Sequence, residues 1–146
     1  MEIEIEYFDL LVHYEYINPK ELVTDKRARW KCMYGCENYG KKSCPPNVPE
    51  PGECIKFLKS YEKGLLFKFI VRNLNELKRV QTYLLNIEEK IKTPYALAIF
   101  PGSCVLCNEP CRMNCKLGRP SLSALCIDAR QFKLKENEMV GLILID

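Results

Sequence analysis

Apolar residues recur every three or four positions in the middle of the chain, a pattern typical of an amphipathic helix. The positions that share this spacing are Leu74, Leu77, Val80, Leu84, Ile87 and Ile91. Asn73 precedes the pattern and Glu76 follows three residues later, as in a capping box at a helix start. The pattern therefore predicts a helix that begins after Asn73 and ends at Thr93-Pro94, because proline cannot extend it.

Two apolar runs flank this helix, at residues 65–71 and 95–100, and both have the composition of strands. A strand, a helix and a second strand in succession predict a βαβ unit with parallel strands and a right-handed crossover. Since both runs are almost continuously apolar, we expect the sheet to be covered on both faces. A last apolar run at residues 139–145 predicts another strand of the same sheet.

The remaining elements have weaker patterns. Residues 51–63 predict a short helix that turns Ile55, Leu58 and Tyr61 inward, and residues 120–132 predict another helix. Residues 7–17 fit a strand or a helix, and residues 21–30 are expected to be helical. The predicted fold is a small α/β domain over residues 1–146, with a mainly parallel sheet covered by helices and two cysteine-rich loops.

Composition narrows the class of protein. The chain has 146 residues and 17.0 kDa, with 47% hydrophobic and 28% charged residues and a mean hydropathy of -0.20. These values fit one globular domain, and no apolar run is long enough to span a bilayer. Residues 1–6 alternate acidic and apolar side chains, which is unlike a secretory signal, so we expect a cytoplasmic protein.

The cysteines are the unusual feature of the composition. The chain has nine cysteines and one histidine, so a bound metal would be held almost wholly by sulfur. An odd count without an export signal favours reduced thiols for metal or redox chemistry over a disulfide framework.

Charge is distributed unevenly along the chain. The net charge is +3, yet residues 1–25 carry seven acidic residues against one lysine, and residues 26–63 carry nine basic residues against four acidic ones. The basic stretches coincide with the cysteines, and cationic side chains stabilise an anionic iron-sulfur centre. A sequence pI of about 8.3 and the absence of a known binding motif disfavour a nucleic-acid partner.

The second cysteine group has the most specific spacing. Four thiols within twelve residues follow a Pro101-Gly102 turn, and they are Cys104, Cys107, Cys111 and Cys115. Intervals of two and three residues let consecutive thiolates surround one compact centre, as in the ferredoxin run C-x2-C-x2-C-x3-C-P. Structural zinc more often takes two C-x2-C pairs set well apart, so the spacing favours an iron-sulfur cluster over zinc.

The first group, in the loop at residues 32–54, allows two ligand sets. Cys32, Cys36, Cys44 and Cys54 together form a complete set, whereas the first three alone leave one iron open to a small ligand. Exchange of ligands between groups is a further alternative, with Cys44 joining the 104–115 set, as happens in two-cluster ferredoxins.

Other residues have plainer interpretations. Cys126 is predicted to be a core thiol in the middle of a helix, and His13 a surface residue. Lys42, Arg112 and Arg119 are candidates for contact with a small anionic substrate or an acidic partner.

Several short motifs resemble a known family. They are Trp30 to Cys36, Tyr39-Gly40, Cys44-Pro45-Pro46, Pro101 to Cys107, Pro110-Cys111-Arg112, Arg119-Pro120-Ser121 and Ile127-Asp128. Together they resemble the uncharacterised family of small cysteine-rich predicted metal-binding proteins of archaea and anaerobic bacteria (domain of unknown function 2284). The resemblance implies metal binding and no particular reaction.

These patterns lead to one main hypothesis and two alternatives. The chain is expected to hold one or two 4Fe-4S clusters and to exchange electrons with a redox partner protein, away from any membrane. One alternative is an enzyme with an open iron on the three-cysteine cluster, and the other is a structural zinc protein that serves as an interaction module. No prediction of oligomeric state follows from the sequence.

Overall fold

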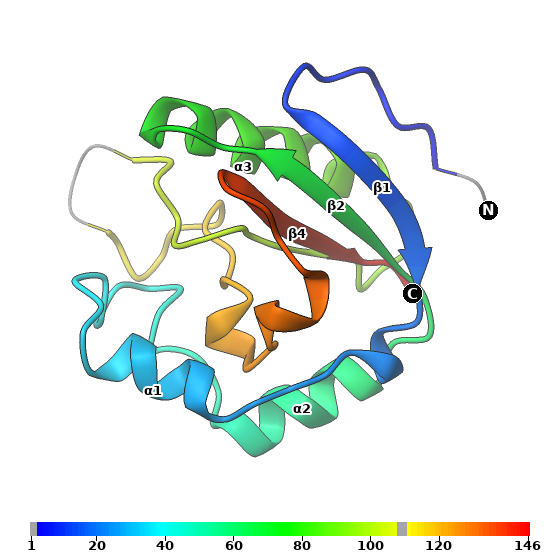
Figure 1. The fold of residues 1–146 in the computed structure, drawn as a ribbon. Coiled ribbons are helices and arrows are strands. Elements are labelled where there is room, and N and C mark those ends of the chain that lie inside the picture. The colour runs from blue at the N-terminus through cyan, green and yellow to red at the C-terminus, as the bar shows by residue number, and fades with distance from the viewer. Residues whose placement is uncertain (1–2, 108–110) are drawn as a thin grey trace.

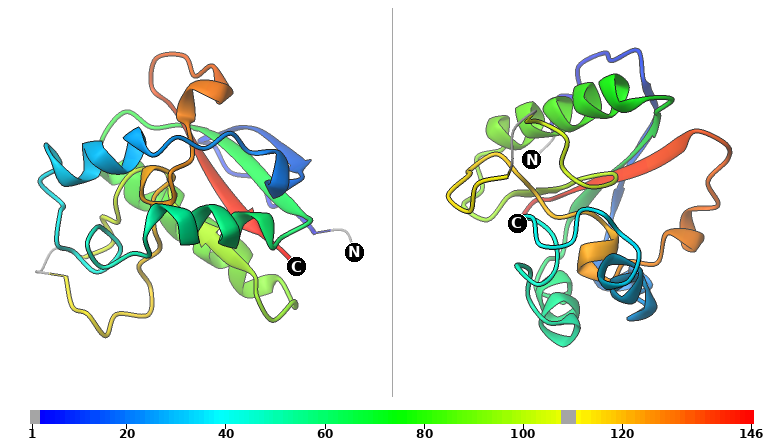
Figure 2. Two further views of the ribbon diagram at one scale, coloured as in Figure 1. Left: turned by 90° about the horizontal axis from the view of Figure 1, so that it is seen from below. Right: turned by 90° about the vertical axis from the view of Figure 1, so that its left-hand side faces the viewer.

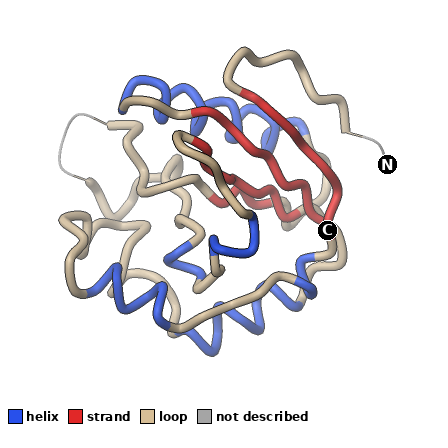
Figure 3. The backbone as a smooth tube through the Cα atoms, viewed as in Figure 1, coloured by secondary structure: helices blue, strands red, loops and turns tan. Residues whose placement is uncertain are grey.

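The protein is described by a computed structural model over residues 3–107 and 111–146. Its sheet has four strands in the order β1-β2-β4-β3 (Figures 1 and 3). The strands are β1 (Leu11–Ile17), β2 (Gly64–Ile70), β3 (Leu97–Ile99) and β4 (Glu138–Leu144). Every neighbouring pair is antiparallel.

The prediction of a mainly parallel sheet is wrong. Strands β2 and β3 do run in the same direction, because each is antiparallel to β4, but β4 lies between them. The two apolar runs were correct indicators of buried strands, whereas burial on both faces carries no information on direction. A strand at the end of the chain has no local signal for where it enters a sheet, so only the tertiary structure places β4. The fold is α+β.

Both faces of the sheet are covered (Figure 2). On one face α3 (Leu74–Lys90) packs its apolar side on alternate residues of β2, among them Phe67 and Phe69. On the other face α2 (Pro51–Lys59) and the segment after residue 120 pack against Leu66 and Leu142. Alternation of side chains along each strand thus fills two separate apolar layers.

The helix expected after Asn73 is confirmed. The Asn73 side chain accepts a hydrogen bond from the Glu76 N–H at 2.9 Å, and the Glu76 carboxylate accepts one from the Arg72 N–H at 2.8 Å. These bonds satisfy backbone donors at the start of α3. The helix ends at Lys90, three residues before the expected limit, where Ile91 becomes extended.

The weaker patterns predicted several of the helices and strands that the structure contains, and one of the predicted helices is absent from the described residues. The helix expected at residues 51–63 is α2, which ends at Lys59. The segment expected to be helical at residues 21–30 is in α1 (Arg27–Met33) only from residue 27 onward, and residues 11–17 form β1. A short 3-10 helix, η1 (Pro19–Glu21), links β1 to this side of the fold.

The single helix predicted for residues 120–132 is wrong. Two short 3-10 helices, η2 (Ser123–Leu125) and η3 (Ala129–Phe132), stand in its place. Cys126 between them has a left-handed φ of 62°, and Asp128 caps the second one through the Arg130 N–H. Cys126 is therefore not in the middle of a helix, although its thiol is fully buried as expected.

None of the helices within residues 3–107 and 111–146 is long and apolar enough to cross a lipid bilayer.

Gly141 allows α3 and the end of β3 to approach β4. A Cβ atom built there would lie 2.6 Å from Leu84 Cδ1 and 3.1 Å from Pro101 Cδ, and Leu84 is fully buried. We expect Gly141→Ala to lower the free energy of unfolding by roughly 1–3 kcal/mol, the usual cost of overpacking a core. Chemical denaturation of the purified protein measures the change.

Gly52 in α2 is the matched control, since nothing lies within 4 Å of a Cβ built there. Gly52→Ala should leave stability unchanged or raise it by up to about 1 kcal/mol. Equal destabilisation by the two substitutions would contradict this account of the β4 contact.

Candidate metal centre

The first cysteine loop starts in the last turn of α1, which carries Cys32. Cys36 and Cys44 follow in a segment without a regular element, where Gly40 has a positive φ of 96°. The Asn47 side-chain amide donates to the Gly40 carbonyl oxygen at 2.9 Å. The loop therefore turns back on itself at Gly40, in a backbone conformation that favours glycine.

The second cysteine loop is attached to α3 by a buried side chain. The Gln81 Nε2 donates to the carbonyl oxygens of Pro101 at 3.3 Å and Ser103 at 2.8 Å, and its Oε1 accepts from the Val105 N–H at 2.9 Å. Gln81 is fully buried. Its amide satisfies three backbone groups on both sides of Cys104, so it fixes the start of this loop against the hydrophobic core.

An ion pair holds the other end of the second loop. The Arg119 guanidinium donates to both carboxylate oxygens of Glu88 on α3, at 2.8 and 2.9 Å, and both side chains are more than four-fifths buried. Arg119 also donates to the Lys116 carbonyl oxygen, directly after Cys115, at 2.8 Å. Glu88 in turn accepts from the Ala98 N–H on β3. A bidentate pair of this kind fixes both position and orientation.

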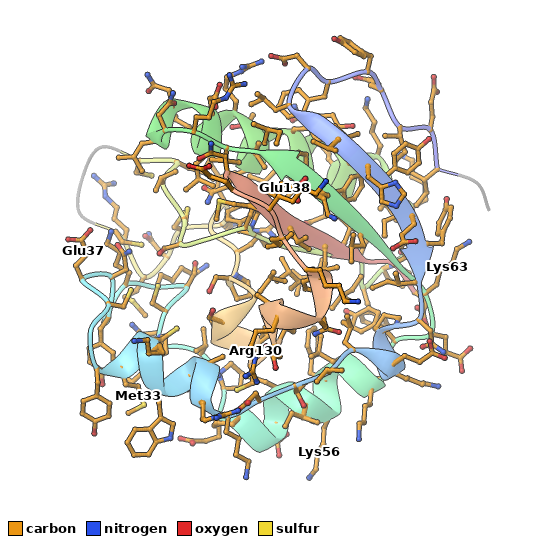
Figure 4. All side chains as sticks on the ribbon, in the orientation of Figure 1. Met33, Glu37, Lys56, Lys63, Arg130 and Glu138 are labelled. Carbon is orange, nitrogen blue, oxygen red and sulfur yellow. The ribbon has the colours of Figure 1, made fainter. Side chains whose placement is uncertain are left out.

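The two cysteine loops meet on one side of the molecule (Figures 1 and 2). The Asn38 side chain of the first loop donates to the Ser103 hydroxyl of the second at 2.8 Å, and the Lys42 ammonium donates to the Cys115 carbonyl oxygen. Figure 4 marks this region by Met33 at the end of α1 and Glu37 in the first loop.

A pocket of about 990 Å³ opens between the loops. Its cysteines are Cys44 from the first loop and Cys104, Cys107, Cys111 and Cys115 from the second. Two cationic side chains, Lys41 and Arg112, line the same pocket, together with apolar Leu106 and Leu117. Sequence positions more than sixty residues apart thus share one sulfur-lined site.

The thiols surround this pocket without meeting at its centre. Within the two described ranges, no three Cys, His, Asp or Glu side chains come close enough together to hold a metal ion. All nine cysteines are free thiols. The donor set nevertheless fits a soft metal or an iron-sulfur cluster, because thiolates are the ligands that such centres take.

Burial and neighbouring sulfur raise the pKa values of two first-loop thiols, Cys44 and Cys32. Burial, followed by the nearby Cys36 and Cys32, raises the pKa of the Cys44 thiol to about 11. Burial is also the main cause that raises the pKa of Cys32. Cys36 and Cys32 thus act on the Cys44 thiol, although neither of them lines the pocket.

The surroundings of Cys115 lower the pKa of its thiol, in contrast to those of Cys44 and Cys32. The backbone N–H groups of Leu117 and Gly118 lower the pKa of its thiol, and the charge of Lys42 adds to the effect. The Leu117 N–H lies 3.4 Å from Cys115 Sγ. Donors that face the sulfur favour the thiolate, which is the form that binds metal.

Cys54 and Cys126 lie outside the pocket. Cys54 Sγ accepts a hydrogen bond from the buried Arg29 guanidinium at 3.1 Å and donates to the Pro49 carbonyl oxygen at 3.3 Å. Arg29 also donates to the Ala124 carbonyl oxygen. This cluster ties α1 to α2 and η2, and the structure does not bring Cys54 to the pocket. Its role as a ligand stays a prediction.

The three predicted anion contacts differ in their surroundings. Arg112 lines the pocket, Lys42 is bound to the Cys115 backbone, and Arg119 is engaged by Glu88. The contacts of Lys42 and Arg119 order the second loop. Contact of any of the three with a substrate or partner stays a prediction.

Sequence reasoning missed Gln81 and Glu88. Both lie on the side of α3 that faces the sheet and the second loop, among apolar positions such as Val80 and Leu84. A polar residue at an apolar position of a helix was the available signal, because a buried amide or carboxylate must find partners.

The fold and the pocket define a small α+β protein whose candidate site is lined by thiols from two loops. A family model described as "Predicted metal-binding protein (DUF2284)" matches residues 15–140, so the chain belongs to this family. The resemblance found in the cysteine motifs is confirmed. No curated protein and no solved structure matches the chain.

Replacing the buried amide tests how the second loop is held. We expect Gln81→Leu to lower the free energy of unfolding by roughly 1–3 kcal/mol, because it leaves backbone groups near Cys104 without partners. Metal affinity should fall as well, since the loop loses its attachment to α3.

Thr82→Ala, on the exposed side of the same turn, is the control and should change neither stability nor metal affinity. Denaturation and metal titration measure the two effects, and full metal affinity in Gln81→Leu would contradict this role.

Proposed function

We propose that this chain holds one or two 4Fe-4S clusters through the thiols of its two loops and passes single electrons to a partner protein. The observation that carries the proposal is the convergence of five thiols, from residues 44 and 104–115, on one pocket. Four of them have the short spacing typical of cluster ligands. Such a cluster, when bound, accepts and releases one electron at a time.

The pocket also has the charge that an anionic centre requires. Lys41 and Arg112 line it, and Lys42 lies against the Cys115 backbone. Cationic side chains stabilise the negative charge of a thiolate-bound centre and favour its reduced state. Apolar Leu106 and Leu117 line the pocket as well. These residues supply the environment of an electron-transfer site and no general acid or base.

Metal binding is expected to complete the folding of the site. The described thiols line the pocket without gathering around one metal ion, and binding of a centre there would order the two loops around it. The contacts that already join them, such as Asn38 with Ser103, limit how far each loop has to move. We place this activity in the cytoplasm, where thiols are kept reduced.

One observation favours a second candidate function for the first loop. Cys54 is the fourth thiol of that group in sequence, and it is engaged by Arg29 beside Ala124. Cys32, Cys36 and Cys44 then form a three-thiol set, which leaves one iron open to a substrate. An enzyme of this kind would use that iron as a Lewis acid, with Lys42 or Arg112 to hold an anionic substrate.

Anaerobic purification tests the main proposal. We expect iron and acid-labile sulfide in equal amounts, four of each per cluster, and a paramagnetic signal after chemical reduction. Cys104→Ser should lose one centre, because this thiol lines the pocket beside Gln81. Cys126→Ala, buried away from the pocket, is the control and should keep full iron.

A colourless protein with stoichiometric zinc after anaerobic purification would instead support the structural zinc alternative. Loss of all iron in Cys126→Ala would contradict the assignment of ligands to the two loops.

A separate substitution decides between the two ligand sets of the first loop. If Cys54 is bound by Arg29 and not by iron, Cys54→Ala should keep the iron content and the paramagnetic spectrum unchanged. Stability should fall by roughly 1–2 kcal/mol, because a buried side chain is shortened and the Arg29 guanidinium loses an acceptor. Spectroscopy and denaturation of the same sample measure both. Collapse of one centre would show that Cys54 is its fourth ligand.

A further inference from the structure

Strand β1 forms an open edge of the sheet. Its inner side pairs with β2, and in the part of the chain that the structure describes no strand lies beyond its outer side (Figure 3). The opposite edge, β3, has three residues, and its Ala98 N–H donates to the Glu88 carboxylate. An unpaired strand edge presents a row of backbone donors and acceptors that can pair with another chain.

The side chains of β1 are unusually exposed for a strand. Tyr14 and Tyr16 lie opposite Phe67 and Leu65 of β2, on the face that α3 covers, yet they remain 47% and 43% exposed. Lys63 lies over the Tyr16 ring at 4.5 Å, close to the end of β1 (Figure 4). Adjacent exposed aromatic rings on a sheet edge are typical of an interaction surface.

The N-terminal segment does not extend the sheet at this edge. The Ile3 N–H donates to the Tyr16 hydroxyl at 3.1 Å, and the Tyr83 hydroxyl of α3 donates to the Glu6 carbonyl oxygen at 2.9 Å. Both contacts place residues 3–9 on the α3 side of the sheet. They widen the helical layer beside β1 and form no backbone ladder with it.

The sequence of β1 is complementary to itself when two copies run antiparallel. About a two-fold axis at Tyr14, His13 of one copy lies opposite Glu15 of the second copy, and the same pair recurs on the other side of the axis. The two side chains are 54% and 56% exposed, so both are accessible to a second chain. A histidine N–H that faces a carboxylate across an antiparallel pair can donate a hydrogen bond to it, whereas two carboxylates in these positions repel each other.

The residues that would face each other in the two copies, 13–15, all lie in the regular part of β1. The register of β1 on β2 shifts between Leu11 and His13, and it is uninterrupted from His13 to Ile17. The shift bends the start of the strand away from the regular edge. The complementary residues 13–15 therefore lie where the edge is straight.

We propose that two copies of this chain associate through β1, in antiparallel register about a two-fold axis at Tyr14, to form one continuous eight-stranded sheet. A two-fold contact of this type uses the same surface on both copies and closes on itself. The cysteine loops lie on the side of the molecule away from β1 (Figure 1). The two candidate metal centres thus lie at the far ends of the dimer, each open to its own partner. The proposal is independent of which metal is bound.

Sedimentation of the full-length protein, purified without oxygen, tests the contact. We expect twice the 17.0 kDa of one chain at micromolar concentration. His13→Glu places a second carboxylate opposite Glu15 at two symmetric positions, which should weaken the dimer by about tenfold. The double variant His13→Glu with Glu15→Lys restores opposite charges and should restore the dimer. Lys56→Glu on α2, another exposed charge, is the control and should leave it unchanged.

Hydrogen exchange supplies a second readout, because amides on the outer side of β1 should become protected as the dimer forms. Far-ultraviolet circular dichroism confirms that each variant is folded. A chain that stays monomeric up to about 100 μM overturns the proposal. A dimer that His13→Glu leaves intact also overturns the proposal. The same holds for a dimer that dissociates on Trp30→Ala, because Trp30 is an exposed aromatic residue of α1 and not of β1.

Discussion

The hydrogen bonds of the buried Gln81 amide connect the hydrophobic core of this protein to its second cysteine loop. Helix α3 is fixed on the sheet by its apolar side, and Gln81 extends that rigidity to the backbone on both sides of Cys104. About two turns further along, Glu88 fixes the exit of the same loop through Arg119. A loop with little regular structure is thereby held at both ends by one helix.

The two cysteine loops are anchored to different parts of the fold. The second loop is anchored to α3 and contributes four of the thiols at the pocket. The first loop is anchored through α1, where Arg29 bonds to Cys54 and Ala124 on the other side of the sheet. Each loop is thus tied to a different apolar layer, and the pocket lies between the two loops. A centre bound there would stabilise the contact between them, as expected for a metal that is coupled to folding.

The β1 edge and the thiol pocket lie at opposite sides of the sheet, which separates two kinds of interaction. Exposed tyrosines and the reciprocal pairing of His13 with Glu15 favour a second copy of the chain at β1. Cations beside sulfur favour an anionic centre and an acidic partner at the pocket. Neither surface obstructs the other, so a dimer of this type leaves both pockets accessible.

The sequence by itself determined the local elements and the chemistry. The capping pair at Asn73, the apolar spacing of α3 and the strands at β2 and β4 follow from patterns within a few residues, and short motifs in and around the cysteine groups identified the family. It did not determine the direction of the sheet, since insertion of β4 between β2 and β3 is a long-range event. Nor did it predict the break at Cys126 or the roles of Gln81 and Glu88. Those depend on which backbone groups the fold buries, and only the tertiary structure decides that.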